Sequence, residues 1–192
     1  MSWTARNGYL TASEMAGNAQ EVANVFLAWG WSQNAIAAML GNMQGESGIN
    51  PGIWENLNPY NGGYGLTQWT PYTKLSTWAE GLGYSWIDNG PTQCKRIDYE
   101  SQNNLQWFYN AEIGMAPPIT FLQFSVSTLP LNDLTNYFLW FYEHPADPWA
   151  GTQATRQGYA QHWYNTLNWS GGGVIPVWML FKIKEGGMFN NA

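Results

Sequence analysis

The segment "SQNAIAAMLGNMQGESGINPG", residues 32–52, decides the fold because it encodes one sharply delimited helix with a charged group at its end. Ser32 is a favourable N-cap residue, and Gly48 is a favourable left-handed residue at a helix C-terminus. Apolar side chains recur between them at helical spacing: Ile36, Met39, Leu40 and Met43. The segment therefore predicts an amphipathic helix with one face in the core.

The carboxylate of Glu46 lies at the C-terminal end of this predicted helix. At 100° per residue it falls about 80° from Ile36, at the edge of the apolar stripe beside Met39. Partial burial and the negative end of the helix dipole both disfavour the charged form, so we expect a raised pKa for Glu46. A carboxyl group that keeps its proton near neutral pH suits general acid catalysis. The alternative is an exposed glutamate at a frayed helix end.

The composition indicates one globular domain with a large core, since 45% of the 192 residues are hydrophobic and only 10% are charged. The net charge is -6 without a basic cluster, which argues against nucleic acid as a partner. We also expect no membrane contact, because the sequence has no apolar run of about 20 residues. The single cysteine, Cys94, cannot form an internal disulfide, and the two histidines do not follow a metal-ligand pattern. No metal or other cofactor is predicted.

Helical periodicity and capping residues predict a mainly α fold. The expected helices span residues 11–30, 32–48, 71–83, 91–109, 120–128, 132–143 and 152–167. In the fourth helix, the pattern places Cys94, Ile97, Leu105 and Phe108 on the inward face. Residues 50–70 are rich in Gly, Pro and Asn and predict a loop or a short hairpin around residues 61–63. We expect one domain over residues 1–168, then a Gly-rich linker and apolar extension over 169–192 that leads towards a second domain not contained in this chain.

A second motif, "GYGLTQW" at residues 63–69, carries groups that suit a sugar ligand. Gly63 and Gly65 allow the backbone to approach a ligand closely. The amide of Gln68 can donate to and accept from sugar hydroxyls or an N-acetyl group, and Tyr64 and Trp69 offer flat faces for stacking. The 13 tryptophans fit the same interpretation, although an aromatic-rich core alone would also explain them.

Taken together, Glu46-Ser47, Asn50-Pro51 and Gly63-Tyr64-Gly65-Leu66 with Gln68 resemble the signature of goose-type lysozymes and Slt-type lytic transglycosylases. The stretches "YLTASEM", "CKRIDYESQNNLQW" and "YEHPADP" are similar to the lysozyme-type domain of phage tail-associated lysins that act on Gram-positive bacteria. This resemblance spans residues 9–168. It implies a lysozyme-like α+β fold and cleavage of the β-1,4 glycan link of peptidoglycan, with Glu46 as the acid.

The same resemblance implies a place in the virion tail, with peptidoglycan glycan strands and other phage tail proteins as partners. In such lysins a metal-dependent peptidase domain can follow the lysozyme domain. The resemblance also points to substrate-binding residues next to Glu46, in "GYGLTQW" and next to Glu143. We predict that Gln68, Trp69, Tyr64, Ser47, Asn50 and Tyr142 bind substrate.

A second catalytic carboxylate is harder to place, because residues 57–79 contain no Asp or Glu. Glu143 is our candidate, since "FYEHPADP" puts it at another helix end before a forced break. It would serve as the second carboxylate or as a hydrogen-bonding partner for sugar, and the alternative is a structural role in the 143–148 turn. Asp147 is a lesser candidate, and Glu55 is interpreted as a surface side chain.

Three functions remain open at this point. The leading one is a glycoside hydrolase of the lysozyme (muramidase) type. The second is a lytic transglycosylase, in which the 6-hydroxyl of the substrate attacks and leaves a 1,6-anhydro product. The third is a non-catalytic wall-binding or structural tail module, against which Glu46 in a complete motif argues.

Overall fold

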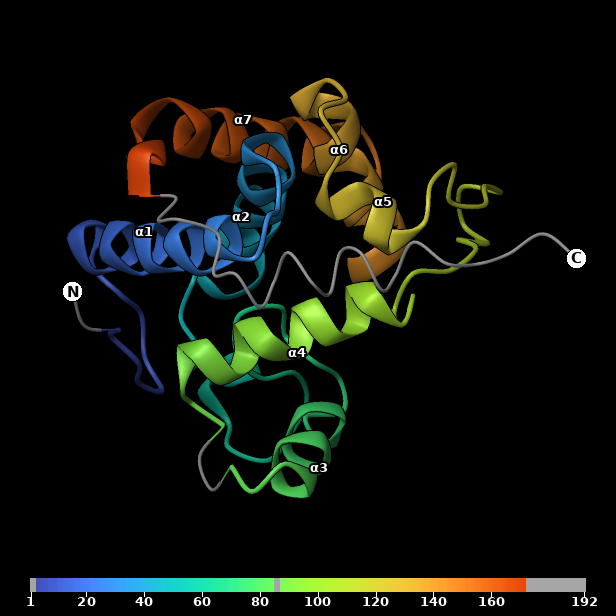
Figure 1. Ribbon diagram of the computed structural model, residues 1–192. Helices are drawn as coiled ribbons and strands as arrows, with labels where there is room; N and C mark the ends of the chain where they lie inside the picture. The colour runs from blue at the N-terminus through green and yellow to red at the C-terminus, as the bar shows by residue number, and fades with distance from the viewer. Residues whose placement is uncertain (1–2, 85–86, 172–192) are drawn as a thin grey trace, which may run out of the picture.

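The computed structural model describes residues 3–84 and 87–171, and the described chain is mainly helical, as predicted (Figure 1). Its α-helices are α1 (Ala12–Ala28), α2 (Gln33–Ser47), α3 (Thr73–Gly81), α4 (Gly90–Gln102), α5 (Phe121–Ser125), α6 (Leu131–Phe138) and α7 (Ala150–Thr166). Short turns of other types are η1 (Glu55–Leu57), the π-turn η2 (Leu139–Glu143) and η3 (Trp169–Gly171). Most of the predicted 169–192 extension lies outside the described residues.

Helix α2 is the centre of the domain, with α1, α5, α6 and α7 packed around it (Figure 1). It is capped as predicted: the Ser32 hydroxyl accepts from the amide of Ala35 at 3.1 Å, and Gly48 is left-handed with φ 62°. Every residue from 35 to 43 is buried, however, so the expected one-sided stripe is wrong. The small residues on its other faces allow neighbouring helices to approach. At Gly41 an added Cβ would lie 2.6 Å from the carbonyl oxygen of Arg156 on α7.

The loop of residues 50–70 lies with α3 and α4 on the other side of the domain (Figure 1). Its predicted hairpin is reduced to isolated antiparallel bridges, from Trp54 to Tyr64 and from Tyr64 to Trp69. Gln93 of α4 holds this loop, because its Oε1 accepts from the amide of Leu66 at 2.8 Å and its Nε2 donates to the carbonyl of Pro51 at 2.7 Å. These two hydrogen bonds therefore fix the 50–70 loop against α4.

Two predicted helices end differently in the structure. The helix expected over 91–109 ends at Gln102, and the positive φ angles of Asn104 and Gln106 show that the backbone has left the helical path. Leu105 and Phe108 are consequently 39% and 49% exposed, which corrects their predicted inward placement. The helix expected over 132–143 is α6 followed by the π-turn η2. Among the described residues, none of the helices has the length and apolarity that a bilayer crossing requires.

Candidate active site

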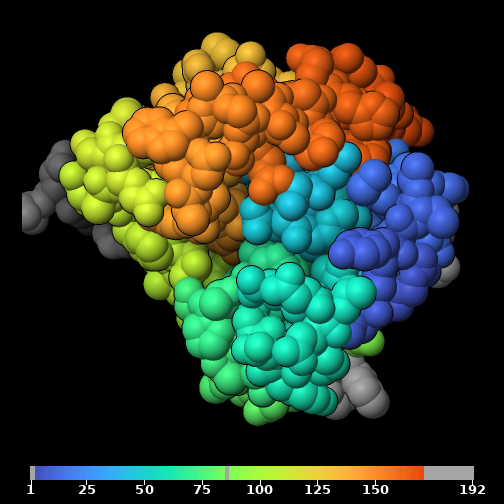
Figure 2. All heavy atoms as spheres, turned by 180° about the vertical axis from the view of Figure 1, so that it is seen from behind, coloured from blue at the N-terminus to red at the C-terminus, as the bar shows by residue number. Residues whose placement is uncertain are grey.

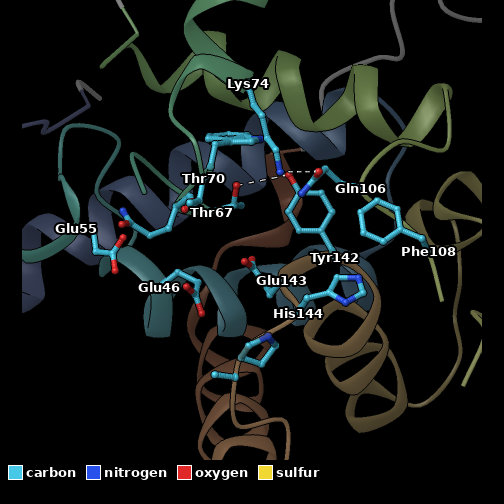
Figure 3. Close-up of a pocket in the computed structure, with 14 residues that line it drawn as sticks. Glu46, Glu55, Thr67, Thr70, Lys74, Gln106, Phe108, Tyr142, Glu143 and His144 are labelled. Atoms are coloured by element: carbon cyan, nitrogen blue, oxygen red, sulfur yellow. Dashed lines mark hydrogen bonds between the residues drawn. The ribbon is translucent and has the colours of Figure 1, made fainter. Parts of the chain in front are cut away.

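One pocket of about 710 Å³ lies between the 50–70 loop side of the domain and the segment that joins α6 to α7 (Figure 2). Side chains from distant parts of the chain meet in it (Figure 3). Its lining residues are Glu46, Glu55, Thr67, Gln68, Trp69, Thr70, Lys74, Gln106, Phe108, Tyr142, Glu143, His144, Pro145 and Ala146.

Glu46 enters this pocket from the last turn of α2 and keeps 22% of its side chain exposed. Its Oε1 accepts a 2.6 Å hydrogen bond from Nη2 of Arg156, which comes from α7. Burial raises the pKa of Glu46, the contact with Arg156 acts in the opposite direction, and the nearby charge of Glu55 adds to the increase. The net direction is upward, as the sequence predicted.

Gly45 explains how Arg156 reaches Glu46. A Cβ at residue 45 would lie 0.6 Å from Nη1 of Arg156 and 1.8 Å from its Cζ. Any side chain there would occupy the space of the guanidinium group. The glycine before Glu46 therefore leaves a slot through which Arg156 passes, and only 11% of the Arg156 side chain remains exposed.

Glu143 is the last residue of the π-turn η2 and lines the same pocket as Glu46 (Figure 3). Its Oε1 is closed off from solvent and has no hydrogen-bond partner among the described residues. Burial raises the pKa of Glu143 well above its ordinary value, and the charge of Glu46 raises it further, while Arg156 opposes the increase. Glu143 is therefore favoured in its protonated, neutral form. π-turns are frequent at functional sites, where the extra residue in the turn redirects side chains.

Behind the pocket lies Glu100 of α4, which is fully buried. Its carboxylate accepts from Nε of Arg96 at 2.8 Å, from the indole N–H of Trp69 at 3.2 Å and from the hydroxyl of Tyr142 at 2.5 Å. Trp69 and Tyr142 both line the pocket, so Glu100 fixes two of its walls. Sequence reasoning missed this residue, because a glutamate within a helix gives no sign of burial unless its partners are known.

The predicted substrate-binding residues fall into two groups. Gln68, Trp69 and Tyr142 line the pocket, and their role there stays a prediction. Tyr64, Ser47 and Asn50 are buried and are not among its lining residues.

Those three residues have contacts within the protein, and their role in substrate binding stays a prediction. Tyr64 packs against Trp54 with ring centroids 4.4 Å apart. The hydroxyl of Ser47 donates to the carbonyl of Leu66 at 2.9 Å, and the amide of Asn50 donates to the carbonyls of Arg6 and Gly8. They join the helix end, the loop and the N-terminal segment. The lesser candidate Asp147 is exposed, lies outside the pocket lining and accepts from the amide of Trp149.

Other lining residues were not predicted from the sequence. Glu55 is exposed, as expected, but it faces the pocket beside Glu46, and its Oε2 accepts from the amide of Gly63 at 2.9 Å (Figure 3). At the other end of the pocket, the rings of Phe108 and His144 stack with centroids 4.9 Å apart. The helix predicted through residue 109 had placed Phe108 in the core. Only the break after residue 102 brings it to the pocket.

The pocket continues into a second hollow of about 230 Å³ on the other side of Glu46. Glu46, Glu55 and Gln68 line both hollows, and the second is completed by Tyr9, Ile53, Trp54, Asn56 and Leu57. Glu46 therefore lies at the junction of an elongated depression. Within residues 3–84 and 87–171, no three His, Cys, Asp or Glu side chains gather as metal ligands would.

The central buried helix and the carboxyl-lined depression at its end define a lysozyme-like helical domain. Comparison with known proteins agrees with this class: the chain belongs to the phage tail lysozyme family, whose model matches residues 17–167. The resemblance to phage tail-associated lysins is thereby confirmed. The chain is also similar to morphogenesis protein 1 of Bacillus phage B103, with 44% identity over 174 residues. That match covers 90% of this chain and 45% of the relative, so the chain spans about half the length of that protein.

Proposed function

We propose that this domain is a muramidase of the virion tail that hydrolyses the β-1,4 glycan backbone of bacterial peptidoglycan. The observation that carries the proposal is the position of Glu46, a half-buried carboxyl group at the junction of two hollows. A polymer lying along both hollows would present an internal bond to this group. Membership of the phage tail lysozyme family supports the choice of peptidoglycan as the polymer.

In the proposed mechanism, Glu46 donates its proton to the leaving glycosidic oxygen. Its pKa is raised mainly by burial, which keeps the proton on the carboxyl group until substrate arrives. The stacked rings of Phe108 and His144 would support one sugar face, and exposed Tyr9 would do so beyond the junction. Both ends of the depression then hold the strand while Glu46 acts in the middle.

The water that completes hydrolysis needs an ionised base, and two carboxyl groups besides Glu46 line the pocket. Glu143 is the sequence-based candidate, but its unpartnered buried oxygen and strongly raised pKa favour the protonated state. A neutral Glu143 would instead exchange hydrogen bonds with sugar. Glu55 is exposed, oriented by the amide of Gly63 and close enough to influence Glu46 electrostatically. We therefore assign Glu55 the role of general base.

Lytic transglycosylation is the second candidate, and the burial of Glu143 favours it. Burial raises the pKa of Glu143 and so disfavours the carboxylate that would activate water, whereas intramolecular attack by the 6-hydroxyl needs no second ionised carboxylate. The two reactions leave different chain ends. Hydrolysis produces a reducing sugar, and transglycosylation produces a 1,6-anhydro sugar that borohydride does not reduce.

Mass spectrometry of fragments released from purified Gram-positive walls tests these functions. We expect fragments with reducing muramic acid ends, which gain two hydrogens on borohydride treatment, and we expect none from the Glu46→Gln variant. Fragments with 1,6-anhydro ends would show that the domain is a lytic transglycosylase and not a hydrolase. Wall binding without any fragments would indicate the non-catalytic module and overturn the enzyme proposal.

The proposed place of action is the cell wall during genome entry, with other tail proteins as partners. Immunogold labelling of virions with an antibody to this domain should mark the tail. Labelling absent from intact virions but present in lysed host cells would argue for an enzyme that acts from within the host.

A further inference from the structure

The proposed acid has a cationic neighbour that does not itself line the substrate pocket. Arg156 is absent from the lining of the pocket that contains Glu46, Glu55 and Glu143, and it reaches Glu46 from α7. Its guanidinium group needs the slot at Gly45, since a Cβ there would lie 0.6 Å from Nη1. The contact therefore depends on two separate features of the chain, Gly45 and an arginine that lies 110 residues beyond Glu46.

We propose that Arg156 is a positioning residue for Glu46: it orients the carboxyl group and stabilises the carboxylate that forms when Glu46 gives up its proton. The inference rests on the proposed function, because it assumes that Glu46 is the acid. A general acid must hold its proton before the reaction and release it during the reaction. Burial keeps the proton on Glu46 before the reaction, and the mostly buried guanidinium group of Arg156 stabilises the carboxylate that forms when the proton leaves.

Other charged groups around Glu46 cannot supply this counter-ion. Those that face Glu46 or its pocket from the surrounding elements are Glu55 on η1, Lys74 on α3, Glu143 on η2, His144 after η2 and, behind Glu143, Glu100 on α4. None of the carboxyl groups can carry a positive charge, and that of Glu55 raises the pKa of Glu46. The amine of Lys74 donates to Oε1 of Gln106 at 3.1 Å, and burial lowers the pKa of His144, which favours its neutral form.

The direction of the pH effect follows directly. Because the Arg156 contact lowers the pKa of Glu46, its removal should raise that pKa and keep Glu46 protonated to higher pH. The rate falls when Glu46 loses its proton, so the alkaline limb of the kcat profile should move to higher pH in Arg156→Gln. The rate itself should fall by roughly tenfold, since the acid, worth about 10²–10⁴, is still present but forms a less stable carboxylate. KM should not change, because Arg156 is outside the pocket lining.

The test compares four variants of the full chain. Arg156→Gln removes the charge, Arg156→Lys keeps it on a shorter group, and Gly45→Ala closes the slot while leaving Arg156 in the sequence. Gly158→Ala is the matched control, because a Cβ at this α7 glycine meets nothing within 4 Å. We expect the alkaline limb to shift upward in Arg156→Gln and Gly45→Ala, to shift less in Arg156→Lys and to stay in place in Gly158→Ala. The double variant Gly45→Ala/Arg156→Gln should shift no further than Arg156→Gln alone.

A second readout separates this inference from the proposed function. Carbon-13 NMR of labelled glutamate carboxyl groups, with the Glu46 signal identified by its loss in Glu46→Gln, should show a higher titration midpoint for Glu46 in Arg156→Gln. An unchanged midpoint and an unshifted limb in a folded Arg156→Gln protein would overturn the role of Arg156. If the wild type releases no wall fragments, the proposed function fails, and a shifted midpoint would still establish the electrostatic coupling.

Discussion

Two glutamates of this domain each accept a hydrogen bond from a mostly buried arginine, yet their surroundings differ. Glu100 is fully buried and its carboxylate accepts from three donors, those of Arg96, Trp69 and Tyr142. Glu46 retains 22% exposure, and the one hydrogen bond that its carboxylate accepts in the described structure comes from Arg156. Burial raises the pKa of both carboxyl groups, so charge state does not separate them. A carboxyl group whose oxygens are saturated with donors is held in place as a structural group, whereas one with free lone pairs facing a pocket can still react. The number of donors distinguishes the two better than burial or pairing with arginine.

The largest expected effect follows from removing the reactive member of this comparison. Glu46→Gln keeps the shape and can still accept from Arg156, but it cannot donate a proton to a leaving oxygen. We expect wall hydrolysis to fall by about 10²–10⁴ while the melting temperature changes little. Fragment release and thermal melting on the same preparation check both halves. Activity within a few-fold of the wild type would remove Glu46 from the mechanism.

Replacing Glu100, the structural glutamate of this comparison, should lower stability more than activity. Glu100→Gln leaves Arg96 without its buried partner and weakens the contacts to Trp69 and Tyr142, so the free energy of unfolding should fall by about 3 kcal/mol. Activity per folded molecule should decrease only a few-fold, because Glu100 does not line the pocket. Chemical denaturation and fragment release measure these quantities. A Glu100→Gln protein with unchanged stability and no activity would reverse the distinction between the two carboxylates.

The two remaining pocket carboxyl groups sharpen the comparison. Glu55→Gln removes the proposed base and should lower kcat by about 10²-fold. Burial already disfavours the charged form of Glu143, so we expect Glu143→Gln to cost about tenfold or less. Steady-state release of soluble fragments across pH 5–8 measures both. If Glu143→Gln proves the more damaging change, Glu143 is the second catalytic carboxylate and Glu55 only a surface residue.

Local sequence rules predicted the parts of the fold that depend on local chemistry. The Ser32 cap and the Gly48 stop both lie where the sequence placed them, because each depends on contacts between residues close together in the chain. Periodicity failed after Gln102, where positive φ angles end a helix that the pattern would have continued. Nothing in the local pattern signals such angles at Asn104 and Gln106.

Long-range contacts limit how much of the candidate site could be predicted from the sequence. The sequence identified Glu46 from a local conflict, a carboxylate at the wrong end of an apolar helix, and it identified Glu143 from a helix end before a proline. It could not pair Glu46 with Arg156 or Glu100 with Tyr142, because those contacts join residues 110 and 42 positions apart. It also treated every polar residue of the motif alike, although Ser47 and Asn50 are buried and bonded to other parts of the protein.

Ser47 provides the smallest and most discriminating test, because it follows Glu46 directly but belongs to the structural group. Its hydroxyl donates to the carbonyl of Leu66 and accepts from the amide of Asn50 at 3.3 Å, so it joins the end of α2 to both ends of the loop. Ser47→Ala should therefore lower the free energy of unfolding by about 1 kcal/mol, the usual net value of a lost hydrogen bond. KM should stay unchanged, since the buried hydroxyl cannot reach a ligand in the pocket, while kcat should fall by at most a few-fold through a looser Glu46. Denaturation midpoints and a kcat and KM pair on soluble glycan fragments separate these effects. A raised KM at unchanged stability would show that Ser47 binds substrate. Closeness to Glu46 in the sequence would then predict function better than the number of hydrogen bonds that hold a side chain in place.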